Sequence, residues 1–178
     1  AERFVRDGAA HVEGEAENAE LQIVAIGAYQ LEEALKAAHR LKTHGRRVLV
    51  TALSEPGRFR IPRDPIEADF TASNDELGAL FPKGMPRVIV SHTRPEPMLG
   101  LLRRLDGGPE TTTARGYVSR GGTLDVAGML FANRCSWAHL IDAAVSLAGW
   151  SRDDFLAPAE RDAVDGRGHP GDIAAFTI

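Results

Sequence analysis

His92 and Arg94 are the residues whose position in the sequence best suits the binding of a ligand. They follow Val88–Val90, a short apolar run that predicts a buried strand. In open α/β sheets, ligands bind beyond the carboxyl ends of the strands. An imidazole and a guanidinium at that edge could hold an anion. The favoured interpretation, however, is that the two residues make ordinary surface contacts in a loop.

A second candidate anion site lies in the turn Gly121-Gly122-Thr123, which precedes the apolar segment 124–131. Free backbone N–H groups at the start of a helix attract anions. Thr123 could equally be the N-cap of that helix. Arg115, which lies in a predicted strand, either hydrogen-bonds across a subunit boundary or satisfies buried backbone groups. The candidate ligand-binding residues are His92, Arg94, Arg115 and Thr123.

Catalytic and metal-binding residues are not indicated by the sequence. Cys135 lies just before a predicted helix, where the helix N-terminus can lower a thiol pKa, but no signature supplies the base that a nucleophile needs. One cysteine and six scattered histidines lack the spacing of a zinc site. The first predicted strand is followed by a single glycine, Gly27, so neither a P-loop nor a dinucleotide fingerprint is present.

The composition is that of an ordinary globular protein, with 178 residues, 43% hydrophobic residues and a net charge of −4. Lys and Arg form no run, and no apolar stretch approaches the roughly 20 residues that span a bilayer. We therefore expect binding to neither nucleic acid nor membrane. A single cysteine and the lack of a signal peptide indicate a cytoplasmic protein, and the lack of an initiator Met indicates a fragment or a processed chain.

Alternating strands and helices must position these residues. Residues 21–26, 30–44 and 47–53 predict a strand–helix–strand unit with parallel strands. The later segments predict helices at 73–80, 97–105, 124–131 and 136–148 and strands at 87–91 and 111–119. This order implies a largely parallel sheet with helices on both faces. Residues 1–20 are expected to form a lead-in or linker, residues 21–149 the domain, and residues 150–178 a surface-wrapping or loosely ordered tail.

The ordered series of segments resembles the C-terminal domain of transketolase-like enzymes. The strands Leu21–Gly27 and Arg47–Leu53, with the acidic, Ala-rich helix that ends at Gly45 between them, carry the first part of this resemblance. The later part is similar to phosphoketolases, and its segments are Asp75-Glu76-Leu77, Arg87–His92, Arg115-Gly116-Tyr117, and Asn133 followed by His139-Leu140-Ile141-Asp142-Ala143.

The resemblance covers roughly residues 4–147, and no single motif in it is diagnostic. Phosphoketolases carry a longer Thr-rich segment after Arg-Gly-Tyr, and an aromatic- and His-rich stretch where this chain has Thr93–Met98. These departures leave open a parent enzyme with another substrate preference, including phosphoketolase-like proteins labelled as xylulose 5-phosphate epimerases.

The resemblance implies a three-layer α/β/α domain with a mixed, mostly parallel five-stranded sheet. In this family, thiamine diphosphate and Mg lie between two other domains of a homodimer, held partly by a Gly-Asp-Gly…Asn-Asn motif. Gly171-Asp172 is followed by Ile173 and by no Asn-Asn pair. The chain is thus expected to bind no cofactor itself, to pack the dimer and to border the entrance for a sugar phosphate such as xylulose 5-phosphate.

Two alternatives differ from this interpretation in functional class. The first is a regulatory α/β module that binds a small anion or a sugar phosphate near His92 and the Gly121–Thr123 turn. The second is a self-contained hydrolase or isomerase, which requires reactive side chains that come together only in the folded chain. In the leading interpretation, the partners are other domains or subunits of the parent enzyme.

Overall fold

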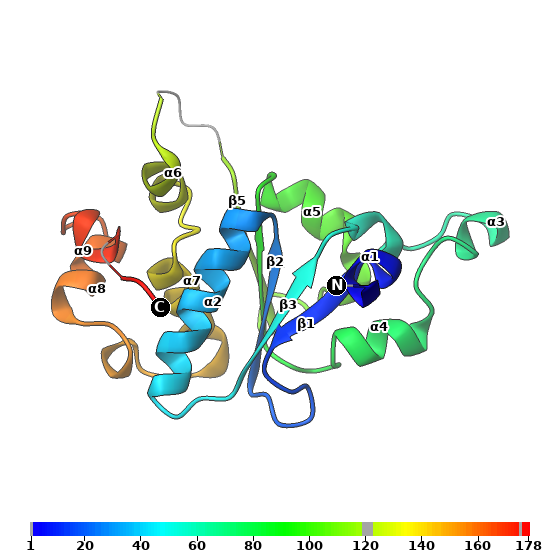
Figure 1. Cartoon of the computed structure of the whole chain (residues 1–178), viewed down its shortest axis with the longest axis horizontal. Helices are drawn as coiled ribbons and strands as arrows, with labels where there is room; N and C mark the ends of the chain where they lie inside the picture. Colours follow the sequence, from blue (N-terminus) through cyan, green and yellow to red (C-terminus); the bar gives the residue numbers. More distant parts are fainter. Residues whose placement is uncertain (1, 119–122, 175) are drawn as a thin grey trace.

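Five strands form one sheet in the order β1-β3-β2-β4-β5 in the computed structural model of the chain (Figure 1). β1 pairs antiparallel with β3, whereas the other three pairings are parallel. The structure describes residues 2–118, 123–174 and 176–178. The strands are β1 Ala9–Glu13, β2 Leu21–Ile26, β3 Val48–Leu53, β4 Arg87–Ser91 and β5 Thr112–Gly116. The predicted mixed, mostly parallel five-stranded sheet is confirmed.

Helices cover both faces of the sheet, as Figure 1 shows. α2 and α7 pack on one face, and α4 and α5 lie on the other. The helices are α1 Glu2–Asp7, α2 Ala28–Thr43, α3 Pro65–Ala68, α4 Asn74–Leu80, α5 Pro95–Leu101, α6 Val126–Ala132, α7 Trp137–Ala148, α8 Pro158–Val164 and α9 Gly171–Ala174, with 3₁₀ turns η1 Pro56–Phe59, η2 Arg103–Leu105 and η3 Arg152–Asp154. The predicted three-layer architecture is therefore also confirmed.

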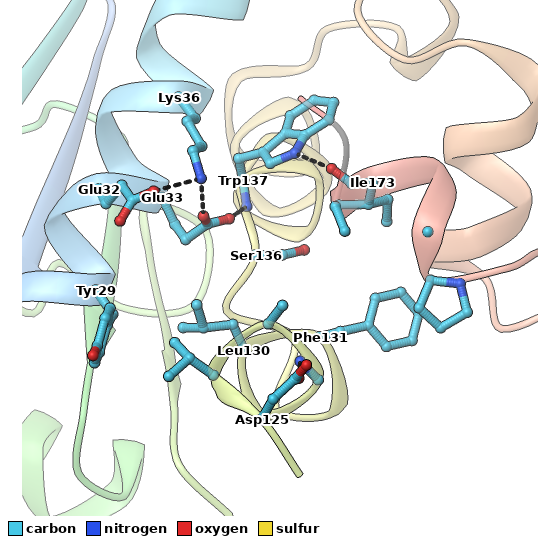
Figure 2. A pocket seen from close by; sticks show the side chains of 16 residues that line it. Tyr29, Glu32, Glu33, Lys36, Asp125, Leu130, Phe131, Ser136, Trp137 and Ile173 are labelled. Carbon is cyan, nitrogen blue, oxygen red and sulfur yellow. Dashed lines mark hydrogen bonds and ion pairs between the residues drawn. The ribbon is translucent and has the colours of Figure 1, made fainter. Parts of the chain in front are cut away.

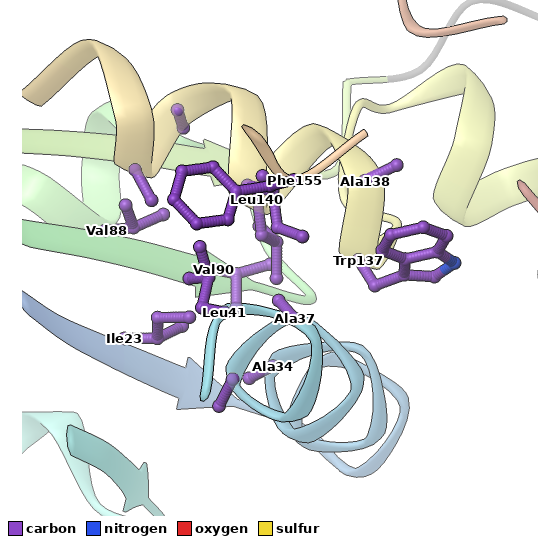
Figure 3. Packing of buried hydrophobic residues seen from close by; sticks show 14 of the residues in the cluster. Ile23, Ala34, Ala37, Leu41, Val88, Val90, Trp137, Ala138, Leu140 and Phe155 are labelled. Carbon is purple, nitrogen blue, oxygen red and sulfur yellow. The ribbon is translucent and has the colours of Figure 1, made fainter. Parts of the chain in front are cut away.

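The two helical layers are held by alternate residues of the same strands. On β2, Ile23 belongs to the core cluster beneath α2 and α7, whereas Val24 belongs to the cluster on the opposite face. Figure 3 shows Ile23 and Val90 directed toward Leu41 of α2 and Leu140 of α7. Burying an aliphatic side chain of this size contributes about 1.5–3 kcal/mol.

The ends of the helices follow from local side-chain chemistry. α4 begins with a capping box, in which Ser73 Oγ accepts from the Glu76 N–H at 3.2 Å and the Glu76 carboxylate accepts from the Ser73 N–H at 2.7 Å. α7 ends at Gly149, whose φ of 68° is a left-handed conformation that favours glycine. Both features were readable from the sequence because they depend only on neighbouring residues.

The N-terminal segment does not form the expected lead-in. Residues 9–13 instead form β1, the antiparallel edge strand, and Ala9 is buried in the core. An edge strand buries only part of its surface, so polar residues such as His11 and Glu13 are tolerated there. The segment therefore lacks the continuous apolar run from which the other strands were predicted. Residues 54–71 contain only η1 and the four-residue α3 as regular structure.

The C-terminal segment differs from the expected loose tail. It forms η3, α8 and α9, and its apolar side chains join the core cluster of α2 and α7. Arg40 of α2 donates two hydrogen bonds to the Glu160 carboxylate, and Trp137 Nε1 donates to the Ile173 carbonyl at 2.9 Å. The buried residues of this segment are Phe155, Leu156, Ala163, Val164 and Ile173. A few well-spaced apolar residues suffice to dock a segment that is polar on average.

Within the described part of the chain, no helix combines the length and the apolarity that are needed to cross a bilayer.

Candidate functional site

A small cavity lies at the topological switch point of the sheet, where the strands that follow β2 in the chain are placed on opposite sides of it. From β2 the chain passes through α2 to β3 on one side, while β4 lies on the other side of β2. Ligands of open α/β sheets bind at such a reversal, beyond the carboxyl ends of the strands. We call this space the switch-point cavity. Its volume is 130 Å³, and its lining is Tyr29, Gln30, Ser91, His92, Tyr117, Val126, Met129, Leu130, Asn133 and Cys135.

Gly27 allows Gln30 and His92 to lie close to the backbone beside the switch-point cavity. Its φ is 115°, and a Cβ there would lie 2.3 Å from Gln30 Oε1 and 3.1 Å from His92 Nδ1. Glycine is therefore required for both conformation and space. The His92 N–H donates to the Ile26 carbonyl at 3.1 Å, and Nδ1 lies 3.0 Å from the same oxygen. Because a carbonyl only accepts, Nδ1 carries the proton, and no partner of Nε2 is found among the described residues.

The polar groups of the switch-point cavity have hydrogen-bonding capacity to spare. Gln30 is 9% exposed as a residue, and its amide has no hydrogen-bond partner within the described residues. Tyr29 and Tyr117 are 55% and 39% exposed as residues, and no partner of either hydroxyl is found among the described residues. Val126, Met129 and Leu130 supply an apolar wall. This combination of apolar walls and a few polar groups is typical of small-molecule sites.

A second cavity of 410 Å³ lies beside the first, and Tyr29, Val126 and Leu130 line both. Figure 2 shows its polar side, where Lys36 Nζ lies 2.8 Å from carboxylate oxygens of both Glu32 and Glu33. We call it the α2–α9 cavity, because it extends from these residues of α2 past α6 and α7 to residues 170–174.

The charges of the α2–α9 cavity have structural roles. Glu33 Oε2 accepts from the Trp137 N–H at 2.7 Å, so the carboxylate of one helix caps the start of another. Burial lowers the pKa of Lys36, and its bonds to Glu32 and Glu33 raise that pKa by more, which leaves it above its ordinary value. Lys36 is thus positively charged at neutral pH and holds the two carboxylates together by ion pairs. With Asp125, the lining holds three acids against one base.

The structure separates the four candidate residues named from the sequence. His92 lines the switch-point cavity, whereas the other three are not among its lining residues. Arg94 is exposed at the start of α5, and Thr123 is exposed. The N-cap of α6 is not Thr123 but Asp125, whose Oδ1 accepts from the Gly128 N–H at 2.7 Å. Gly121 and Gly122 lie outside the described residues.

Arg115 lies on β5 and does not contribute a cation to the switch-point cavity. Its Nε is buried without a hydrogen-bond partner within the described chain. Burial lowers its pKa, and the neighbouring charge of Arg134 lowers that pKa further. The cavity that His92 lines therefore lacks the positive charge expected of a phosphate site.

Gln30 and Tyr29 are the residues of this region that the sequence did not single out. The segment 27–30 was tested only as a phosphate loop, for which one glycine is too few. The segment lies directly after a buried strand, and this position could have indicated a ligand site, because the same position led to the choice of His92.

No family model matches the sequence, and no curated protein matches it.

Transketolases are among the solved structures that match the fold. The transketolase from Leishmania mexicana is 21% identical over 87% of this chain and 20% of its own, with a TM-score of 0.55. A transketolase from Pichia stipitis in complex with xylulose 5-phosphate is 16% identical over 83% of this chain and 19% of its own, with a TM-score of 0.58. The fold is transketolase-like. The chain spans about a fifth of the length of these enzymes, and its sheet matches that of their C-terminal α/β domain.

The transketolase-like domain does not present the residues of a metal–diphosphate site. Within residues 2–118, 123–174 and 176–178, no three His, Cys, Asp or Glu side chains gather closely enough to hold a metal ion. Gly171 and Asp172 lie in α9, where the Asp172 carboxylate accepts from the His169 N–H at 3.3 Å.

Cys135 of the transketolase-like domain is a structural residue. It is 1% exposed, and burial raises the pKa of its thiol to about 12, so the lowering of the pKa that a helix N-terminus can cause is not found here. Its Sγ donates to the Asn133 carbonyl at 3.3 Å. We expect the folded chain to react with a disulfide reagent at neutral pH roughly a thousandfold more slowly than an unfolded thiol, because three pKa units separate them. Rapid labelling without denaturant would contradict this assignment.

His139 should make the stability of the domain sensitive to acid. It is 2% exposed, and burial, aided by the charges of Arg134 and Arg115, lowers its pKa to about 4. An unfolded histidine takes up its proton near pH 6.5. Between these values only the unfolded state is protonated, so stability is lost as the pH falls, by about 3 kcal/mol in total.

Urea unfolding at a series of pH values tests this expectation. His139→Gln should flatten the decline between pH 6.5 and 4, whereas the same change at the exposed His44 should leave it unchanged. An equally steep decline in His139→Gln would assign the acid sensitivity to other groups.

Proposed function

We propose that this chain is the C-terminal domain of a thiamine-diphosphate enzyme that acts on sugar phosphates such as xylulose 5-phosphate. One observation carries the proposal: most of this chain has the fold of a piece that makes up about a fifth of transketolase. The phosphoketolase-like series of segments in the sequence supports a parent enzyme of that kind. The cofactor and Mg belong to the other domains, on the same chain or on a partner.

In this proposal the chain packs a homodimer and borders the substrate entrance. An exposed apolar surface supports such packing. Segment 60–71 projects from the helical layer around α3, as Figure 1 shows. It carries Ile61, Ile66 and Phe70, which are 55%, 74% and 68% exposed. Apolar side chains gathered on one projecting segment are typical of a surface that another domain covers.

The proposal is tested on the complex that forms around the chain in its source organism. The chain, tagged at its C-terminus, is expected to copurify with thiamine diphosphate and with activity that consumes xylulose 5-phosphate. The double substitution Ile66→Asp and Phe70→Asp should abolish this copurification and leave the melting temperature of the chain nearly unchanged. Ile178→Asp, at an exposed residue near the opposite end of the molecule, is the matched control.

Two results would contradict the proposal. A purified complex without thiamine diphosphate would show that the chain does not belong to a thiamine-diphosphate enzyme. Tight binding of thiamine diphosphate and Mg²⁺ to the isolated chain, measured by calorimetry, would show that the chain itself holds the cofactor.

A further inference from the structure

We infer that the switch-point cavity binds a neutral, planar heterocycle of the nucleobase class. The inference combines three properties of the cavity: its charge, the hydrogen-bonding edge of Gln30, and its size and walls. It concerns the isolated chain, so it does not depend on the parent enzyme proposed above.

The charge of the lining excludes an anion as the favoured ligand. Among the described residues that line the cavity, none is Asp, Glu, Lys or Arg. A phosphate buried there would lose its hydration without a compensating charge or bidentate donor. The adjoining α2–α9 cavity carries Glu32, Glu33 and Asp125 against Lys36, so a phosphate that extended in that direction would meet net negative charge. The ligand therefore carries no phosphate.

Gln30 sets the hydrogen-bonding pattern of the ligand. A carboxamide presents a donor and an acceptor side by side, which matches the paired acceptor and donor on the edge of a nucleobase. Gln30 as a whole residue is 9% exposed, and no hydrogen-bond partner of its amide is found among the described residues, so the amide is free to bond a ligand in the cavity. His92 adds an acceptor, because its Nδ1–H is committed to the Ile26 carbonyl and its Nε2 is not. A ligand with both donors and acceptors uses these groups together.

The size and walls of the cavity select one flat ring system. Its 130 Å³ is well below the roughly 300–1,000 Å³ of pockets that enclose a whole drug-sized ligand. The rings of Tyr29 and Tyr117 are partly exposed at this cavity, and aromatic faces stack on bases. Met129 supplies a flexible, polarisable side chain that adapts to a ring edge. A base is thus enclosed while its sugar extends toward the α2–α9 cavity, which shares Tyr29, Val126 and Leu130 with this one.

Adenosine and uridine are the probes, and saturable binding to the 178-residue chain is measured by calorimetry and as a concentration-dependent rise in melting temperature. At least one of them is expected to bind. Gln30→Leu should weaken that binding at least tenfold, and so should Met129→Glu, which places a carboxylate in the cavity. The nucleoside monophosphate should bind at least tenfold more weakly than the nucleoside. Arg94→Ala, two residues from His92, should have no effect.

Three outcomes would overturn the inference. One is no saturable binding of either nucleoside at millimolar concentration. Another is a monophosphate that binds as tightly as its nucleoside and loses affinity in Arg94→Ala, which would identify an anion site instead. The third is unchanged affinity in both Gln30→Leu and Met129→Glu when each variant melts cooperatively, which would place the binding elsewhere on the chain.

Discussion

A chain shortened to residues 1–149 is expected to lose its cooperative unfolding transition at room temperature. The missing segment supplies Phe155, Leu156, Val164 and Ile173, all of which are no more than 3% exposed. At about 1.5–3 kcal/mol for each side chain, their burial contributes roughly 6–12 kcal/mol. The free energy of unfolding of a whole domain is only about 5–15 kcal/mol, so the lost burial is comparable to the entire stability of the domain.

Circular dichroism during urea titration measures this effect. Removal of the exposed residues 177 and 178 alone is the matched control and should leave the unfolding midpoint nearly unchanged. If the 1–149 chain unfolds cooperatively with the midpoint of the full chain, the C-terminal segment is dispensable and the predicted domain boundary at residue 149 stands.

The parallel core of the fold was predictable because its signals are local and apolar. β2, β3 and β4 are continuous buried runs, and α2 and α7 carry apolar stripes with the period of a helix. β1 and the C-terminal segment were not predictable in the same way. Their residues are buried by contacts with distant parts of the chain, such as Ala9 against β3 and Ile173 against Trp137.

The candidate site was predictable in position and not in composition. His92 was selected because it follows a strand, and the structure places it at the switch-point cavity. Arg115 was named with it as a candidate ligand-binding residue, but residues of one strand alternate between the two faces of a sheet, and the neighbouring residues in the sequence do not determine which face Arg115 takes. Gln30 was missed because an amide at the start of a helix has no distinguishing pattern in a sequence.

Arg87→Ala is expected to lower the free energy of unfolding by about 3–5 kcal/mol, since it removes the centre of a buried polar network. Arg87 is 5% exposed on β4. Its Nε donates to Gln22 Oε1 at 2.7 Å, its Nη1 to the Leu105 carbonyl at 2.6 Å and its Nη2 to the Pro82 carbonyl at 2.9 Å. No carboxylate pairs with it among the described residues, and burial lowers its pKa to about 10.

The size of the effect follows from what the substitution leaves behind. Three acceptors in or near the core, the Gln22 amide oxygen and the two carbonyls, would lose their donor at once, and each unsatisfied group costs about 1–3 kcal/mol. Gln22 itself is held from the other side, where its Nε2 donates to Thr51 Oγ1 and to the Leu80 carbonyl, both at 2.8 Å. It therefore cannot turn to find another donor without breaking those bonds.

Arg87→Lys separates the geometry of the network from its charge. A lysine ammonium keeps the positive charge but cannot present the planar fork that reaches all three acceptors, so we expect it to recover less than half of the lost stability. Arg63→Ala, which removes an exposed guanidinium paired with Glu67, should leave the urea midpoint nearly unchanged. If Arg87→Lys instead matches the original chain, the positive charge rather than the fork holds β4 to the loops that carry Pro82 and Leu105, and the network argument fails.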